Sequence, residues 1–342
     1  MRPVPGLQAV ACLLFLTLSI GGWLSGGARA AENVTLILNA PPNGLHTGIV
    51  YAQRKGFYTR AGLHVTIERG KGSGHTVRKV VKQQKALGLG ELAAVIESRA
   101  EGVDAAGVAL LMERFPGTLI ALKGSGIRAP ADLQGRRLAG PASSFSRILF
   151  PSFAERAGVN LDSVRWSDIG STSGIQALLG GQADAVVTAE TSHWRYERAA
   201  RRKKKETLSF PYAARGVEVY GLSLLAPVRL IQEGEKTVRR MVDATIRGLA
   251  EAMTRPGEAL KLFHSSFPAY PSEGARAEWR VFLKSWSAGG LKNPGLGFFE
   301  EARVRKLQSL LVRGRLLTKE FPPNSLFTNL FVPSVSVQPV SF

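Results

Sequence analysis

Cysteine is nearly absent from this chain of 342 residues, because the single one is Cys12, close to the N-terminus. Beyond that position the protein has no thiol, so it can form no internal disulfide or cysteine metal site and has no cysteine nucleophile. Its stability must therefore come from a packed core. Hydrophobic residues make up 44% of the chain and charged residues 21%, a composition typical of globular proteins rather than disordered or fibrous ones.

Histidine is also scarce, and the familiar catalytic motifs are missing. The five histidines are spaced so that no two share one face of a helix as metal ligands. The chain has no G-x-S-x-G, H-E-x-x-H or P-loop pattern, and no G-x-G-x-x-G after a predicted strand. The glycine-rich loop Gly70–Gly74 lacks the Gly-Lys-Ser/Thr ending of a phosphate loop. We therefore expect no enzyme activity, no metal and no cofactor.

Long apolar runs are confined to the first thirty residues. Residues 9–18 are almost wholly apolar and follow Arg2, and Ala28-Arg29-Ala30 supplies the small residues that signal peptidase requires. The run is too short to span a bilayer comfortably. We expect residues 1–30 to be a signal peptide cleaved near Ala30, which would leave a periplasmic protein. A retained N-terminal anchor is the alternative.

Acidic residues are few relative to basic ones. The chain has 45 Lys and Arg against 26 Asp and Glu, a net charge of +19, which becomes +17 without Arg2 and Arg29 of the leader. The basic residues are spread along the chain, apart from one dense run at Arg198–Lys205 that has no interleaved aromatic residue. This pattern and the export signal argue against nucleic-acid binding. They favour a solvated helix end, solubility, or attraction to anionic surfaces.

Short apolar strands alternate with helical segments along the chain. This rhythm predicts an α/β fold with largely parallel sheets, in which one half of the molecule is inserted into the other. After the last strand the chain is chiefly helical to about residue 313, and a helix at 144–157 contains Pro151, which should kink it. The predicted strands are 34–39, 63–68, 86–90, 105–111, 118–122, 137–139, 164–169, 183–188 and 218–226.

Four turns that lead from a strand to a helix are rich in small, helix-capping residues. Ligands of open α/β sheets bind at the carboxyl ends of the strands, and the free N–H groups of a helix N-terminus can accept an anion or a polar ring. Two such sheets facing each other would bring all four turns to one cleft, although capping alone also explains each turn. The turns are Asn43–Thr47, Gly70–Gly74, Pro141–Ser146 and Gly170–Gly174.

Several motifs resemble those of one known family. The segments Leu38–Gly48 (LNAPPNGLHTG), Tyr51–Tyr58 (YAQRKGFY) and Ala61–Val65 (AGLHV) are similar to the opening of the thiamine-pyrimidine-precursor, sulfonate and nitrate binding proteins of ABC importers. Further similarity lies at Ser125–Gly135 and Ala177–Ala185. The resemblance covers residues 33–226 well and the helical remainder in outline.

The resemblance implies a bilobal type II periplasmic-binding-protein fold, with two mostly parallel α/β lobes joined by a two-segment hinge. Lobe 1 would comprise residues 31–123 plus 217–325, lobe 2 residues 124–216, and residues 326–342 an extended tail. A monomer would close its lobes on a small solute and present it to an ABC permease and its ATPase at the inner membrane. A sensory module that signals to a membrane receptor is an alternative with the same architecture.

The string Asn43…His46-Thr47 is closest to the subgroup that binds formylated or hydroxymethyl pyrimidine precursors of thiamine. In that subgroup an aromatic or polar residue usually follows the first strand, often as Asp-Trp, and this chain has Asn39 and Ala40 there, without the ring. A flat heterocycle gains much of its affinity by stacking on an aromatic face. The resemblance therefore needs a ring from elsewhere in the chain.

That ring could come from Phe145, Trp194 or Tyr220, and Glu190 could accept an amino group from the ligand. Packing on a helix face explains Phe145 and Trp194 equally well. The candidate ligand-binding residues are Asn39, Asn43, His46, Thr47, Ser73, Gly74, Ser144, Phe145, Ser171, Thr172, Glu190 and Tyr220.

A sulfonate, nitrate or another small anion is the main alternative ligand, because the helix N-termini at Ser73–Gly74 and Ser171–Thr172 suit it. However, Lys71 is the only Lys or Arg in the four turns, so no bidentate anion clamp is visible. An enzyme like the fungal thiamine-pyrimidine synthases is the alternative of another class. Those relatives carry a cysteine-rich segment that this chain lacks. We therefore favour an uncharged heterocycle that is bound without turnover.

Overall fold

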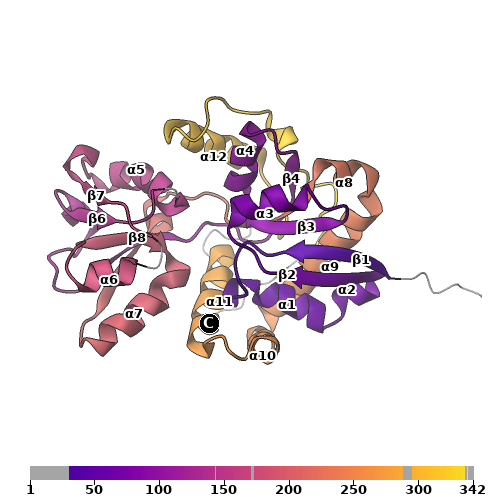
Figure 1. The fold of residues 1–342 in the computed structure, drawn as a ribbon, viewed down its shortest axis with the longest axis horizontal. Coiled ribbons are helices and arrows are strands. Elements are labelled where there is room, and N and C mark those ends of the chain that lie inside the picture. The colour runs from indigo at the N-terminus through magenta and orange to yellow at the C-terminus, as the bar shows by residue number, and fades with distance from the viewer. Residues whose placement is uncertain (1–30, 143, 171–172, 288–294, 336, 338–342) are drawn as a thin grey trace, which may run out of the picture.

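The computed structural model describes residues 31–142, 144–170, 173–287, 295–335 and 337. Their strands form two separate five-stranded sheets, and Figure 1 shows them as two α/β units lying side by side. We call each sheet with the helices packed on it a lobe, the first lobe being the one that contains the N-terminal strand. None of the helices in these residues has an apolar stretch long enough to cross a membrane.

The sheet of the first lobe is mostly built from the N-terminal part of the chain. Its strand order is β2-β1-β3-β10-β4. Strand β1 is parallel to β2 and β3, whereas β10 is antiparallel to both of its neighbours, so the sheet is mixed. The strands are β1 (Glu32–Ile37), β2 (Leu63–Glu68), β3 (Ala86–Glu91), β4 (Ala105–Leu110) and β10 (Leu222–Pro227).

The sheet of the second lobe has the order β7-β6-β8-β5-β9. Strand β6 is parallel to β7 and β8, and β5 is antiparallel to β8 and β9. The sequence pattern does not predict β9, a short half-buried strand that ends in proline. The strands are β5 (Gly117–Leu122), β6 (Arg137–Ala139), β7 (Arg165–Ser167), β8 (Ala185–Ala189) and β9 (Thr207–Pro211).

Two chain segments connect the lobes. Residues 111–116 lead from β4 to β5, and residues 212–221 lead from β9 back to β10. The segments lie side by side, because Phe115 N donates to Val219 O at 2.8 Å and Gly221 N donates to Met112 O at 3.0 Å. The predicted two-segment connection is therefore present. The return strand starts at Leu222 rather than Glu218, since the residues before it belong to this connection.

Strand β5 belongs to a different lobe from the one predicted for it. The family resemblance puts residues up to 123 in lobe 1, but β5 pairs with β8 and β9 of the second lobe. Gly124 and Gly126, both at positive φ (84° and 83°), follow β5 and reverse the chain within the second lobe. We propose residues 111–116 as the boundary instead.

Twelve helices are described, and most of them cover the first lobe. Helices α1 and α2 pack against α9, α10 packs against α1, and α11 lies on the side that faces the second lobe, where it contacts α7 (Figure 1). Helix α5 continues through Pro151. The first-lobe helices are α1 (Thr47–Arg54), α2 (Phe57–Arg60), α3 (Ser73–Val80), α4 (Leu92–Ala100), α8 (Val228–Glu233), α9 (Glu235–Thr254), α10 (Pro256–Ser266), α11 (Ser272–Ser287) and α12 (Glu301–Arg313); the second-lobe helices are α5 (Phe145–Ala157), α6 (Gly174–Leu179) and α7 (His193–Arg202).

The described part of the C-terminal tail packs on the first lobe. Gly107 N in β4 donates to Leu326 O, and Thr328 N donates to Gly107 O, both at 2.9 Å. Leu326 is fully buried and Phe331 nearly so. The described part of the predicted extended tail is therefore bound to the sheet of the first lobe, and its apolar side chains are buried there.

Candidate ligand-binding cleft

A cavity of about 330 Å³ lies between the lobes, at the strand ends that the sequence predicts. The first lobe contributes Asn39, two residues beyond β1, the loop before α3 and the end of β3. The second lobe contributes the turn before α5, the end of β8 and one residue of α7. The lining residues are Asn39, Gly72, Ser73, Glu91, Phe115, Gly140, Pro141, Ser144, Phe145, Ser146, Ile169, Gly170, Gly174, Val186, Val187, Thr188, Ala189 and Tyr196.

The orientation of Asn39 is set by His46, which lies directly behind it. Burial lowers the pKa of the His46 imidazole to about 3, so the ring is neutral. Its Nδ1 accepts the backbone N–H of Asn43 at 3.1 Å, so the proton is on Nε2, which donates to Asn39 Oδ1 at 2.9 Å. Because the Asn39 oxygen is occupied, the amide nitrogen is the group that Asn39 offers to a ligand.

The glycine-rich loop reaches the cleft because it packs tightly against the end of β1. Gly72 N donates to Asn39 O at 2.7 Å, and a Cβ on Gly70 would lie 1.8 Å from Leu38 O. Gly72 has a φ of 112°, which favours glycine. The loop places Ser73 beside Glu91 at the end of β3, and the Ser73 hydroxyl donates to that carboxylate.

Aromatic side chains form part of the cleft wall. The ring of Phe145, at the start of α5, meets Phe115 of the connection edge to face, with centroids 4.9 Å apart. Ser144 caps α5 by accepting the N–H of Arg147 at 3.3 Å. Burial raises the pKa of the Tyr196 hydroxyl to about 12, so it stays protonated and can donate to a ligand. Phe145 is thus a ring that lines the cleft, on the side opposite Asn39.

Three predicted residues support the cleft without lining it. Asn43 accepts the N–H of Leu45 at 3.0 Å, and the Thr47 hydroxyl donates to Gly44 O at 2.8 Å, so both are capping residues. Gly74 lies on the first turn of α3 and faces Arg78. Ser171 and Thr172 were also predicted, but they lie outside the described residues.

Three further predicted residues lie elsewhere. Tyr220 is buried against Phe299 and accepts the N–H of Glu300 at 2.7 Å, so its ring belongs to the core of the first lobe. Trp194 is buried beneath α11. Glu190 lines a neighbouring cavity of about 430 Å³, which shares Phe115 with the cleft. Burial raises the pKa of the Glu190 carboxyl, an effect that Lys284 and Arg114 oppose.

The described lining of the cleft is acidic, although the protein as a whole is basic. Among the described residues that line it, Glu91 is the only charged one, and there is no Lys, Arg or His. The residues predicted from the sequence do not include Glu91, Phe115 or Tyr196. Glu91 ends a strand, so the rule that ligands bind at the ends of strands could have identified it. Phe115 and Tyr196 have no such signal in the sequence.

Several known proteins are similar to this chain. The sequence profile of the NMT1/THI5-like family matches residues 43–259. The formylaminopyrimidine-binding protein of Halalkalibacterium halodurans is 24% identical over 236 residues, which cover 68% of this chain and 70% of that protein. The 4-amino-5-hydroxymethyl-2-methylpyrimidine phosphate synthase of Legionella pneumophila is 29% identical over 139 residues, or 41% of this chain and 44% of the enzyme.

Among solved structures, the periplasmic aliphatic sulphonate binding protein SsuA from Escherichia coli superposes with a TM-score of 0.69. The two chains are 12% identical, and the match covers 91% of this chain and 96% of SsuA. This likeness confirms the predicted periplasmic-binding-protein fold with its two α/β lobes. Because the family profile spans most of both lobes, this chain belongs to the NMT1/THI5-like family.

Proposed function

We propose that this protein is the extracytoplasmic solute-binding component of an ABC importer. Its ligand is a flat heterocycle with an amino group, of the thiamine-pyrimidine-precursor class. The family and the fold support capture of a small solute between two lobes. Binding in such a cleft draws the lobes together, and the closed shape is what a permease with its ATPase recognises.

The charge of the cleft lining carries this choice of ligand. Glu91 places a carboxylate in the cleft, and no described lining residue supplies a cation. A sulfonate or nitrate would lose its hydration shell beside a negative charge, without a guanidinium or ammonium group to compensate. An amino group, in contrast, can donate to the carboxylate. The cleft therefore favours an amine-bearing ligand over a small anion, despite the positive charge of the whole protein.

The remaining cleft groups suit an aminopyrimidine. Such a ring presents a nitrogen acceptor next to an exocyclic amino donor. Asn39 offers an amide donor and Glu91 a carboxylate acceptor, and both lie on the first-lobe side of the cavity. The ring of Phe145 on the opposite side offers an apolar face for stacking.

The lining residues also favour binding without turnover. The described part of the cleft contains no Lys, Cys or His that could act as a nucleophile or form a Schiff base. The synthase from Legionella pneumophila aligns with less than half of this chain, so its activity carries little weight here.

A thermal-shift screen of the purified protein tests the proposal. The panel should contain 4-amino-5-hydroxymethyl-2-methylpyrimidine, its formylamino relatives, the deaminated 4-hydroxy analogue, methanesulfonate and nitrate. A ligand at ~100 times its Kd adds roughly 2.7 kcal/mol to the stability. We expect stabilisation by the aminopyrimidines and much less by the 4-hydroxy analogue. Stabilisation by the anions alone would overturn the choice of ligand and leave a sulfonate-type receptor.

A further inference from the structure

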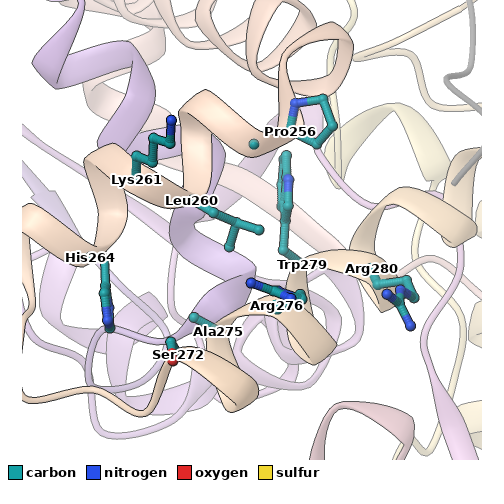
Figure 2. Close-up of a pocket in the computed structure, with 10 residues that line it drawn as sticks. Pro256, Leu260, Lys261, His264, Ser272, Ala275, Arg276, Trp279 and Arg280 are labelled. Atoms are coloured by element: carbon teal, nitrogen blue, oxygen red, sulfur yellow. The ribbon is translucent and has the colours of Figure 1, made fainter.

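A second cavity, of about 390 Å³, lies outside the interlobe cleft, between helices α10 and α11 of the first lobe. It shares no lining residue with the cleft. Pro256, Leu260, Ala275 and Trp279 form its apolar wall, and Figure 2 shows the Trp279 ring standing between α11 and Pro256. Its volume falls in the range that small-molecule sites occupy.

Two buried polar atoms of residues that line this cavity have no hydrogen-bond partner among the described residues. Trp279 is 1% exposed, yet its indole Nε1–H has no hydrogen-bond acceptor among the described residues. The Nδ1 of His264 is likewise buried without a partner in that part of the chain. Buried indole N–H groups are normally hydrogen-bonded, because an unpaired donor loses its hydration without compensation. The Trp279 donor is therefore an unsatisfied hydrogen-bonding group in the wall of the cavity.

The cavity is also cationic. Lys261, Arg276 and Arg280 line it, and no carboxylate is among the described residues that line it. None of the three cations forms an ion pair with a described acid. In Figure 2 the Arg276 side chain lies beneath Leu260, next to the apolar wall.

The acidic residues of these two helices are engaged elsewhere. Glu258 of α10 pairs with Lys55 at 3.0 Å, and Glu273 of α11 pairs with Arg201 at 2.8 Å. Glu278 is buried on another face of α11, where it accepts the N–H of Gly44. The positive charge at the cavity is thus not neutralised by its own helices.

We infer that the α10–α11 cavity is a second ligand site, which binds a small organic anion with a flat apolar body, such as an aromatic carboxylate. The apolar body packs against Leu260, Ala275 and Trp279. Its carboxylate accepts the Trp279 N–H and faces Arg276 and Arg280. This preference is opposite to that of the cleft, where Glu91 favours an amine. The two sites therefore take different ligands, and this inference does not depend on the proposed function.

Titration with 2-naphthoate tests the site. The neutral 2-naphthylmethanol and the cationic 2-naphthylmethylammonium serve as charge controls, all in about 0.15 M salt to screen diffuse attraction. Calorimetry gives the affinity, and the ¹H–¹⁵N indole resonance of Trp279, assigned with Trp279→Phe, reports the hydrogen bond. We expect saturable binding of the carboxylate with a shift of that resonance, and roughly tenfold weaker binding of the other two compounds.

Variants locate the binding. The exposed double change Arg276→Gln with Arg280→Gln should weaken 2-naphthoate roughly tenfold, and Trp279→Phe should weaken it several-fold. Two control variants should leave the affinity for 2-naphthoate unchanged. They are Arg229→Gln, which removes one positive charge on α8, and Glu91→Gln in the cleft. Equal binding of all three compounds, equal effects of Arg229→Gln, or no saturable binding up to ~1 mM would overturn the inference.

Discussion

The indole Nε1–H of Trp194 donates a hydrogen bond to Glu278 Oε1 over 3.2 Å and thereby joins α7 of the second lobe to α11 of the first. The Trp194 ring lies so close to Gly274 that a Cβ there would be 2.5 Å from it. Glu278 is 4% exposed and also accepts the hydroxyl of Tyr270 and the N–H of Gly44. This contact lies apart from the two connecting segments, so it holds the lobes together from a second place.

Trp194→Phe should therefore shift the protein toward more open arrangements of the lobes. The change keeps a ring but removes the donor, a loss of about 1 kcal/mol. The closed arrangement becomes several-fold less populated, and the apparent ligand affinity falls in proportion. Small-angle scattering and calorimetry measure the two effects. Arg201→Gln is the control, since its exposed pair with Glu273 contributes little. Unchanged scattering and affinity in Trp194→Phe would show that the contact does not control closure.

His46 should make the protein less stable in acid. Its pKa is about 3 in the folded protein against an ordinary value of 6.5, so the unfolded chain binds more protons between these values. The stabilisation is fully present above pH 6.5 and is lost as the pH falls toward 3, by at most about 1.4 kcal/mol per pH unit. Burial raises the pKa of Glu278, which acts in the opposite direction.

Urea unfolding at pH 7 and pH 4.5 measures this effect when wild type is compared with His46→Gln. Glu278 is present in both proteins, so its contribution cancels in the difference. We expect a smaller loss of stability on acidification in the variant. Equal losses in the two proteins would mean that His46 is accessible to protons in the folded state.

Glu91→Gln should weaken the binding of an aminopyrimidine by roughly tenfold, because a charged acceptor for the amino group becomes neutral. The Gln oxygen can still accept the Ser73 hydroxyl, so the loop should keep its position. Glu190→Gln is the matched control, since Glu190 lines the neighbouring cavity. Calorimetry measures the ligand affinity of both variants. A larger loss from Glu190→Gln would move the ligand to that cavity.

Gly70→Ala should destabilise the first lobe by about 2 kcal/mol, because the new methyl group would collide with the backbone of β1. It should also displace Ser73 and weaken ligand binding. Gly74→Ala is the control: there the methyl group meets only the flexible end of Arg78, and alanine favours the helix. Denaturation midpoints of the two variants test this contrast, and similar values would contradict the close approach.

Much of the fold follows from local patterns. The predicted bounds of β2 and β6 agree with the structure residue by residue, because alternating or bounded apolar runs are a local property of the chain. The strand-end rule likewise placed Asn39, Ser73, Ser144 and Phe145 at the cleft. Strand β9 lacked such a signal: it is short, ends in proline and directly follows the basic run.

The sequence by itself determined the α/β rhythm, the insertion of one lobe in the other, and the turns that meet at the cleft. Only the tertiary structure decided which side chains face that cleft. Glu91 ends a strand and Glu190 directly follows one, and Phe145, Trp194 and Tyr220 are equally plausible rings in sequence. Packing turned Glu91 and Phe145 toward the cavity and buried Tyr220 and Trp194, because these directions depend on contacts between residues far apart in the chain.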